Sequence, residues 1–301
     1  MDRELLNLVV EELRQLRSEG VEGVSMSDET LRVLECAGKG EKERGGSVAS
    51  DSAVSTKRSA DQGGPRPPVE VEVSRESSLA DVPEIALPPG SKREQWEWLQ
   101  GRVLSCPVCR ENLNPGKKIV FGVGNLDAEL FFCGEAPGAD EETQGEPFVG
   151  KAGELLNGMI RAMGLKREDV YIGNIMNWRP QTGTAFGNRP PTDEEMDFCL
   201  PYLKAQIEII QPKVVVALGG TAAKGLLGVE TKGQMSRLRG KWNEFHDTPL
   251  MVTYHPSYLL HQESVASKRK VWEDLLMVME KLGMEITEKQ RNFFLAAMGK
   301  S

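Results

Sequence analysis

The sequence has no long apolar run, and it is poor in cysteine. No stretch approaches the roughly 18–20 apolar residues that a helix needs to span a bilayer, so we expect no membrane-spanning segment. No basic segment followed by an apolar stretch predicts a secretory signal. The five cysteines, an odd number, argue against a disulfide-stabilised secreted scaffold. We therefore expect a soluble protein of the reducing cytoplasm.

An excess of basic charge is also missing. Residues 1–94 carry 13 Lys and Arg against 19 Asp and Glu, and residues 95–301 carry 24 against 26. This balance argues against a strong non-specific binder of polyanions. The acidity lies mostly in the N-terminal third, so the charge does not exclude a nucleic-acid partner for the rest of the chain.

Composition divides the chain into three parts. Residues 1–36 form the expected N-terminal helical segment, with an amphipathic helix predicted at 3–18 because Leu5, Val9 and Leu13 recur on one face. Residues 37–91 are rich in Gly, Ser, Pro and charge, which predicts a disordered linker. Residues 92–301 form the expected catalytic domain.

Apolar runs and amphipathic segments alternate along this third part. We predict strands at 128–133, 169–175, 213–218 and 249–254, and helices at 93–104, 152–165, 192–210, 220–227, 267–283 and 286–298. Strands separated by helices predict an α/β fold, with a mainly parallel sheet in a three-layer α/β/α sandwich.

The loop after the first predicted strand is the most informative segment. It reads Gly-Glu-Ala-Pro-Gly at residues 134–138 and Pro-Phe-Val-Gly at residues 147–150. Parallel α/β folds place their chemistry in such loops, and an aromatic ring beside carboxylates suits a site that stacks a planar ring. The alternative is a structural turn that needs Gly. The dinucleotide fingerprint Gly-x-Gly-x-x-Gly is absent, so we expect no nucleotide cofactor.

Polar side chains also end two later strands. Asn174 offers an amide whose donors and acceptor match a pyrimidine edge, although such an Asn can instead bond to the local backbone. His255 ends the fourth predicted strand, where a structural role is the alternative. Because the carboxyl ends of parallel strands meet at one edge, we expect Glu135, Asn174 and His255 to lie together.

Three further patterns leave alternatives open. Cys106, Cys109 and Cys199 resemble an iron–sulfur or zinc arrangement that is one thiolate short, and inert packing is the other interpretation. The basic residues at 236–242 suit a loop that contacts phosphate, or a solvated hairpin. The apolar residues at 258–260 could wedge into a base stack or simply pack at a helix start.

Taken in order, these motifs resemble the type-4 uracil-DNA glycosylases of the uracil-DNA glycosylase superfamily. The resemblance covers roughly residues 95–280, and collinear motifs are more specific than any one of them. The matching segments are Gly-Glu-Ala-Pro-Gly at 134–138, Gly-x-Pro-Phe-Val-Gly-x-Ala-Gly-x-Leu-Leu at 145–156, Tyr-Ile-x-Asn at 171–174, Arg-Pro at 179–180, Asn-Arg-x-Pro at 188–191 and His-Pro-Ser-Tyr-Leu-Leu at 255–260.

The resemblance implies a sandwich around a central four-stranded parallel sheet and hydrolysis of the N-glycosidic bond of deoxyuridine in DNA. It implies a monofunctional enzyme of base-excision repair that flips the base out of the stack. Phe148 would stack on the uracil, Asn174 would read its N3–H and O4, and His255 would hydrogen-bond O2.

The same resemblance assigns the acidic loop. Glu135 would border the pocket and help place the attacking water, and its neighbours Gly134 and Ala136 would bind the substrate. Glu141 would lie near C5 of the base and help exclude the methyl group of thymine.

The sequence departs from the family at one iron–sulfur ligand. Cys106, Cys109 and Cys199 match three ligand positions of a 4Fe-4S cluster, and Trp178 occupies the fourth. A three-cysteine cluster with an outside ligand, or no cluster, is then expected.

Two questions stay open at this stage. The first is function: a non-catalytic relative that binds uracil or DNA, or a glycosylase for another deaminated base, are the alternatives. The second is the helix within residues 1–36, which could dock a replication or repair protein or serve only solubility.

Overall fold

The computed structural model describes residues 81–182, 188–228, 235–261 and 264–295. The helix expected within residues 1–36, and the expected linker up to residue 80, lie outside these ranges. Residues 81–90, the end of the expected linker, run without helix or strand, and Ile85 and Leu87 pack against the core. Helix α3 (Lys92–Ser105) follows directly. No helix in the described ranges is long and apolar enough to cross a membrane.

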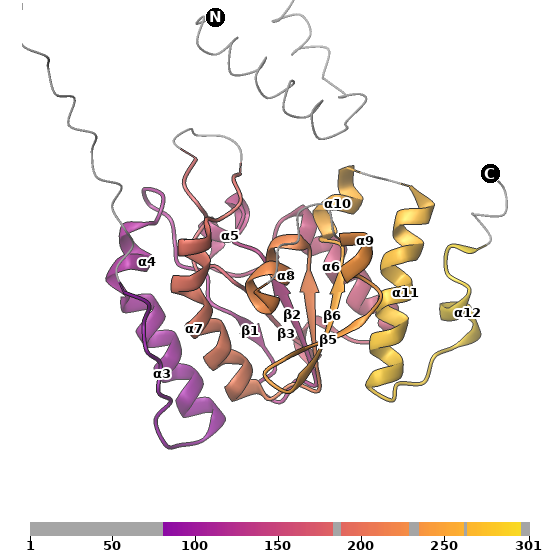
Figure 1. The fold of residues 1–301 in the computed structure, drawn as a ribbon, viewed down its shortest axis with the longest axis horizontal. Coiled ribbons are helices and arrows are strands. Elements are labelled where there is room, and N and C mark those ends of the chain that lie inside the picture. The colour runs from indigo at the N-terminus through magenta and orange to yellow at the C-terminus, as the bar shows by residue number, and fades with distance from the viewer. Residues whose placement is uncertain (1–80, 183–187, 229–234, 262–263, 296–301) are drawn as a thin grey trace, which may run out of the picture. The chain divides into compact units, whose positions relative to one another are not determined.

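A six-stranded sheet forms the centre of the domain, in the order β1-β3-β2-β4-β6-β5 (Figure 1). The four central strands are parallel, and both edge strands are antiparallel to their neighbours. The strands are β1 (Val123–Gly124), β2 (Leu130–Gly134), β3 (Tyr171–Asn174), β4 (Val214–Leu218), β5 (Trp242–Phe245) and β6 (Thr248–Thr253). The predicted α/β fold with a central four-stranded parallel sheet is therefore confirmed.

Helices cover both faces of the sheet, which gives the predicted three layers (Figure 1). One face carries α3 with α4 (Pro107–Glu111), α7 (Asp193–Ile210) and α8 (Gly220–Leu227), and the other carries α6 (Lys151–Met163) and α11 (Val265–Lys281). Alternate residues of β2 face opposite layers: Phe131 and Cys133 pack with the first, Leu130 and Phe132 with the second. Burial on both sides explains why the central strands are almost continuously apolar.

The remaining elements of the described residues are short. They are α5 (Ala139–Gln144), the 3-10 helix η1 (Arg167–Asp169), α9 (Met235–Leu238), α10 (Pro256–His261) and α12 (Glu288–Arg291).

Local sequence fixes where the long helices begin. Ser91 caps α3 by accepting the backbone N–H of Glu94 at 3.3 Å, and the Glu94 carboxylate accepts the Ser91 N–H at 2.8 Å. Thr192 and Glu195 form the same reciprocal pair at the start of α7. Each capping box satisfies two backbone donors that the first turn would otherwise leave unpaired.

The prediction of one continuous helix at 286–298 is wrong. Within the described residues of this segment, α12 is a single turn and is followed by turns at residues 292–294. Phe294 has a left-handed backbone with φ of 69°, which a continuing helix does not allow. Carbonyls that a longer helix would use are occupied by side chains, because Trp272 donates to Gln290 O at 2.6 Å and Arg269 donates to Phe293 O at 2.9 Å.

Candidate active site

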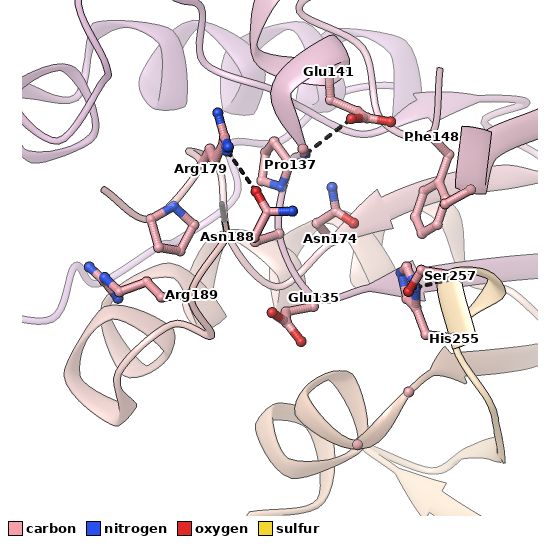
Figure 2. A pocket seen from close by; sticks show the side chains of 16 residues that line it. Glu135, Pro137, Glu141, Phe148, Asn174, Arg179, Asn188, Arg189, His255 and Ser257 are labelled. Carbon is pink, nitrogen blue, oxygen red and sulfur yellow. Dashed lines mark hydrogen bonds between the residues drawn. The ribbon is translucent and has the colours of Figure 1, made fainter. Parts of the chain in front are cut away.

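A pocket of about 350 Å³ opens at the carboxyl ends of β2, β3, β4 and β6. The structure thus brings Glu135, Asn174 and His255 to one edge of the sheet (Figure 2). The lining consists of Glu135, Ala136, Pro137, Gly138, Glu141, Phe148, Ala152, Asn174, Arg179, Pro180, Asn188, Arg189, Gly219, Gly220, His255 and Ser257. Of the residues expected to bind substrate, Gly134 alone lies just behind this wall.

Asn174 is the last residue of β3 and lies beside Gly134 of β2. Its side chain is buried, with 7% exposed, and its Oδ1 has no hydrogen-bond partner. A buried acceptor without a partner costs about 1–3 kcal/mol. Asn174 also lines the pocket, so a ligand that donates a hydrogen bond would satisfy this oxygen.

Phe148 presents its ring to the same pocket from the loop between α5 and α6 (Figure 2). Its φ is 53°, a left-handed conformation that a bulky residue rarely adopts. The ring centroid lies 5.7 Å from that of His255, with the planes 33° apart. A Cβ on Gly134 would meet Phe148 Cζ at 2.5 Å, so only glycine leaves room for the ring. Such backbone strain, at about 1–3 kcal/mol, persists where the surroundings over-determine it.

The Glu141 carboxylate contacts backbone rather than open solvent. Its Oε2 accepts the N–H of Gly138 at 3.1 Å, and its Oε1 accepts the N–H groups of Val149 and Gly150, each at 3.0 Å. Glu141 therefore ties the start of α5 to the segment that follows Phe148. The exclusion of a methyl group by Glu141 remains a prediction.

His255 follows β6 and holds its proton on Nε2. Its Nδ1 accepts the backbone N–H of Ser257 at 3.2 Å and lies 2.7 Å from the Ser257 hydroxyl. A ring nitrogen that accepts a backbone N–H cannot itself carry a proton, so the neutral tautomer has its N–H at Nε2. Burial lowers the pKa of His255 to about 4, and the Glu141 carboxylate opposes this only in part. At neutral pH the ring is an uncharged hydrogen-bond donor.

Glu135 follows β2 directly and forms part of the pocket wall. Burial raises the pKa of Glu135, and a hydrogen bond from the Thr221 side chain acts in the opposite direction. A carboxylate in such a place is suited to hold a water or to stabilise a nearby positive charge.

Arginines on the far wall were not singled out by the sequence analysis. Arg179 donates to Asn188 Oδ1 at 2.8 Å and pairs with the buried Glu142 at 2.9 Å. Arg189 forms a bidentate pair with Glu195, with both distances 2.7 Å. The Arg-Pro and Asn-Arg segments were the only signal for this wall, and their pairing with acids of α5 and α7 has no sequence pattern.

One basic residue of the run at 236–242 is paired and two are exposed. Arg239 is held by the buried Asp274, at 3.1 and 2.7 Å, and lies 5.6 Å from the ring of Tyr254. Arg237 and Lys241 are exposed. In the segment 258–260, Leu259 is buried, Tyr258 is half-buried and stacks on Tyr254, and Leu260 is 41% exposed. Leu260 is therefore the most accessible candidate for a wedge.

The three cysteines that match iron–sulfur ligand positions meet where α3 and α4 approach α7. Cys106 is in side-chain contact with Cys109, and Cys109 with Cys199. The hydrogen bond to Cys109 and burial raise the pKa of the Cys106 thiol. Trp178, at the fourth ligand position, is fully buried, and its Nε1–H has no partner.

These residues do not fit a four-cysteine cluster. An indole N–H cannot replace a thiolate as a ligand, since it is a donor only. Among the described residues no group of three or more His, Cys, Asp or Glu is arranged to hold a metal ion. The contacts are those of thiols that hydrogen-bond to one another inside an apolar core.

Comparison with known proteins agrees with this geometry. A sequence model of the Uracil DNA glycosylase superfamily matches residues 121–276. The type-4 uracil-DNA glycosylase of Thermotoga maritima is 41% identical over 186 residues, which are 62% of this chain and 93% of the relative. That of Archaeoglobus fulgidus is 39% identical over 200 residues, 64% and 94% of the two chains. That of Sulfurisphaera tokodaii is 34% identical over 218 residues, 68% and 92% of the two chains. The chain is therefore a member of the uracil-DNA glycosylase superfamily and belongs to its type-4 uracil-DNA glycosylases.

Proposed function

We propose that this protein hydrolyses the N-glycosidic bond of deoxyuridine in DNA, releasing uracil and leaving an abasic site for base-excision repair. The observation that carries the proposal is the unpartnered Oδ1 of Asn174, buried in the wall of the pocket beside Phe148 and His255. The relatives of this protein are named for this activity. The base must leave the helical stack to reach such a pocket.

Uracil satisfies the amide of Asn174 in full. Its N3–H donates to Oδ1 while its O4 accepts from Nδ2. Cytosine presents the opposite pattern at these two positions, which leaves both polar groups mispaired. A site that hydrogen-bonds its substrate rejects such an analogue strongly, because the buried groups stay unpaired.

Phe148 acts on the flat face of the base, and His255 acts on its O2. The Phe148 ring stacks on the flipped uracil. The Nε2–H of the neutral His255 donates to O2, where negative charge develops as the glycosidic bond breaks. A fixed donor aimed at a developing charge stabilises the transition state more than the ground state.

Glu135 acts on the sugar side. Its carboxylate positions the attacking water and stabilises the oxocarbenium-like centre at C1′, as carboxylates do in other glycosidases. No lysine lines the pocket in the described part of the chain, which supports hydrolysis without a Schiff-base intermediate. The groups just named are therefore proposed to carry out the whole reaction.

The proposal extends to the substrate and the compartment. DNA is the substrate, and the cytoplasm is the expected compartment. Docking of a replication or repair protein by the helix within residues 1–36 stays a prediction.

The test is excision by the purified full-length protein on matched oligonucleotides that carry U, T, C or hypoxanthine at one position, with alkaline cleavage of abasic sites. Cutting at U alone supports the proposal. Cutting at hypoxanthine in place of U would assign another deaminated base. Binding to uracil DNA without cutting would assign a non-catalytic relative.

A pair of histidine variants tests the site within the same assay. His255→Ala should lower the rate of excision about 10²–10³-fold, because it removes the donor to O2. His246→Asn is the control, since His246 is exposed at the β5–β6 turn and Asn tolerates its left-handed backbone, with φ of 45°. Equal rates in both variants would contradict the assignment of His255.

A further inference from the structure

We propose that Arg167 is a positioning residue for the reaction: with Glu141 it clamps the backbone of residues 147–150, the Phe148 loop, and so holds the Phe148 ring over the base. This inference rests on the proposed function, in which Phe148 stacks on uracil. Arg167 does not line the pocket and therefore acts through the residues that it holds in place.

The Phe148 loop needs such a clamp. Phe148 has its φ at 53° while its side chain is only 5% exposed, so a large ring is held in the pocket wall by a backbone that it disfavours. A residue in this conformation relaxes unless its surroundings over-determine it. The position of the ring therefore depends on contacts to the loop backbone.

Arg167 holds the carbonyl side of the loop. Its Nη2 donates to Pro147 O at 2.6 Å, and its Nη1 donates to Phe148 O at 3.2 Å. Nη1 also donates to Asn157 Oδ1 at 3.0 Å, which anchors the guanidinium to α6. A guanidinium is a planar fork with fixed donor directions, and it spans two adjacent carbonyls as an ammonium cannot.

Glu141 holds the amide side of the same loop. Its Oε1 accepts the N–H groups of Val149 and Gly150, each at 3.0 Å. Two carbonyls and two amides in four consecutive residues are thus fixed by opposite charges on either side. Figure 2 shows Glu141 to the upper left of Phe148, with its carboxylate toward that residue.

The start of α6 closes the third side. A Cβ on Gly153 would collide with the backbone carbonyl of Phe148, so α6 lies directly against the loop. Burial lowers the pKa of Arg167, and the carboxylates of Glu146 and Glu141 act in the opposite direction. The loop is therefore enclosed by packing and by two ionic groups.

The clamp predicts a specific pattern in kinetics. Misplacing a positioning group by about 1 Å can cost about 10²-fold in rate. Arg167→Met should therefore lower kcat/KM for uracil excision by about 10–100-fold. In a Phe148→Ala background the same change should cost less than about twofold, because the ring that Arg167 positions is absent. Equal losses in both backgrounds would overturn the proposal, since a residue that acts on general stability is additive.

Two matched variants separate the clamp from charge and from folding. Arg161→Met removes an exposed arginine of α6 and should leave the rate of excision and the rate of amide hydrogen exchange unchanged. Arg167→Lys keeps the positive charge but lacks the planar guanidinium, so its kcat/KM should lie between those of wild type and Arg167→Met. It also replaces Arg167→Met if that variant does not fold, and wild-type kcat/KM in Arg167→Lys would then overturn the proposal.

Amide hydrogen exchange tests the clamp without any reaction. The amides of the peptide spanning residues 145–155 should exchange faster in Arg167→Met than in wild type. In Arg161→Met they should exchange at the wild-type rate. If wild-type protein fails to excise uracil, the proposed function fails while this measurement still tests the clamp. Unchanged exchange in Arg167→Met would overturn the inference.

Discussion

Asn174 has a buried hydrogen-bond acceptor without a partner in the wall of the pocket. Its Oδ1 is buried and unpaired, whereas Gln206, with 1% exposed, is satisfied by Tyr171 Oη at 3.1 Å and by Tyr202 O at 3.3 Å. Native proteins rarely leave a buried polar atom without a partner. Asn174 therefore has a hydrogen bond in reserve for a ligand, and Gln206 has none.

These two residues should respond to truncation in opposite ways. Asn174→Ala should lower uracil excision at least about 10²-fold, yet leave the free energy of unfolding unchanged or raise it by up to about 1 kcal/mol, because an unpaired oxygen is removed. Gln206→Ala should retain excision and lower the free energy of unfolding by about 1–3 kcal/mol, because the buried Tyr171 hydroxyl loses its acceptor. Urea unfolding and single-turnover excision measure both. A loss of more than about 2 kcal/mol in Asn174→Ala would contradict this account.

Sequence placed the side chains at strand ends but not the contacts between them. Glu135, Asn174 and His255 were predictable because each directly follows or ends an apolar run. Arg167 was not, because it contacts backbone carbonyls 19 and 20 positions away, and any residue there offers the same carbonyl. The backbone contacts of Glu141 escaped for the same reason.

At the scale of elements, predictability follows burial. The four central strands were found to within about two residues, because they are buried on both faces and read as apolar runs. The edge strands β1 and β5 were missed. β1 has two residues, and only Phe245 of the four residues of β5 is buried. Short helices such as α5 were read as loop, since one or two turns leave no period to detect.

The prediction about metal concerns the three cysteines at the junction between α4 and α7. Cys106 caps α4 and Cys109 lies in it, while Cys199 lies in α7, so the thiol contacts join the two helices. Trp178 stands where a fourth ligand is expected. We expect the protein as purified without oxygen to hold no stoichiometric iron and to show no cluster absorption.

Restoring the fourth thiolate should reverse this result. Trp178→Cys should bind iron and sulfide on reconstitution and gain the visible band of a cluster, because four cysteines complete the usual ligand set. Trp178→Phe, which offers no ligand, is the control and should stay colourless. Four irons in each wild-type chain would show instead that three cysteines and an outside ligand suffice.

At the scale of the whole molecule, the pocket is assembled within one part of the chain. All of its lining residues fall between Glu135 and Ser257. The type-4 relatives are covered over 93% and 94% of their length by only 62% and 64% of this chain. About a third of this chain therefore has no counterpart in those relatives.

This arrangement predicts that the N-terminal third is dispensable for excision. Deleting residues 1–80 should leave kcat/KM on a short uracil oligonucleotide within about twofold of the full chain, because no pocket residue is removed and distant sites are independent. Deleting residues 1–91 is the comparison: it removes Ile85 and Leu87 from the core and the Ser91 cap of α3, and it should also lower stability by about 1–2 kcal/mol or more. A tenfold or greater loss of kcat/KM with the shorter deletion would mean that residues 1–80 contribute to the site. Removing a distant, independent segment should change the transition-state free energy by well under about 1 kcal/mol.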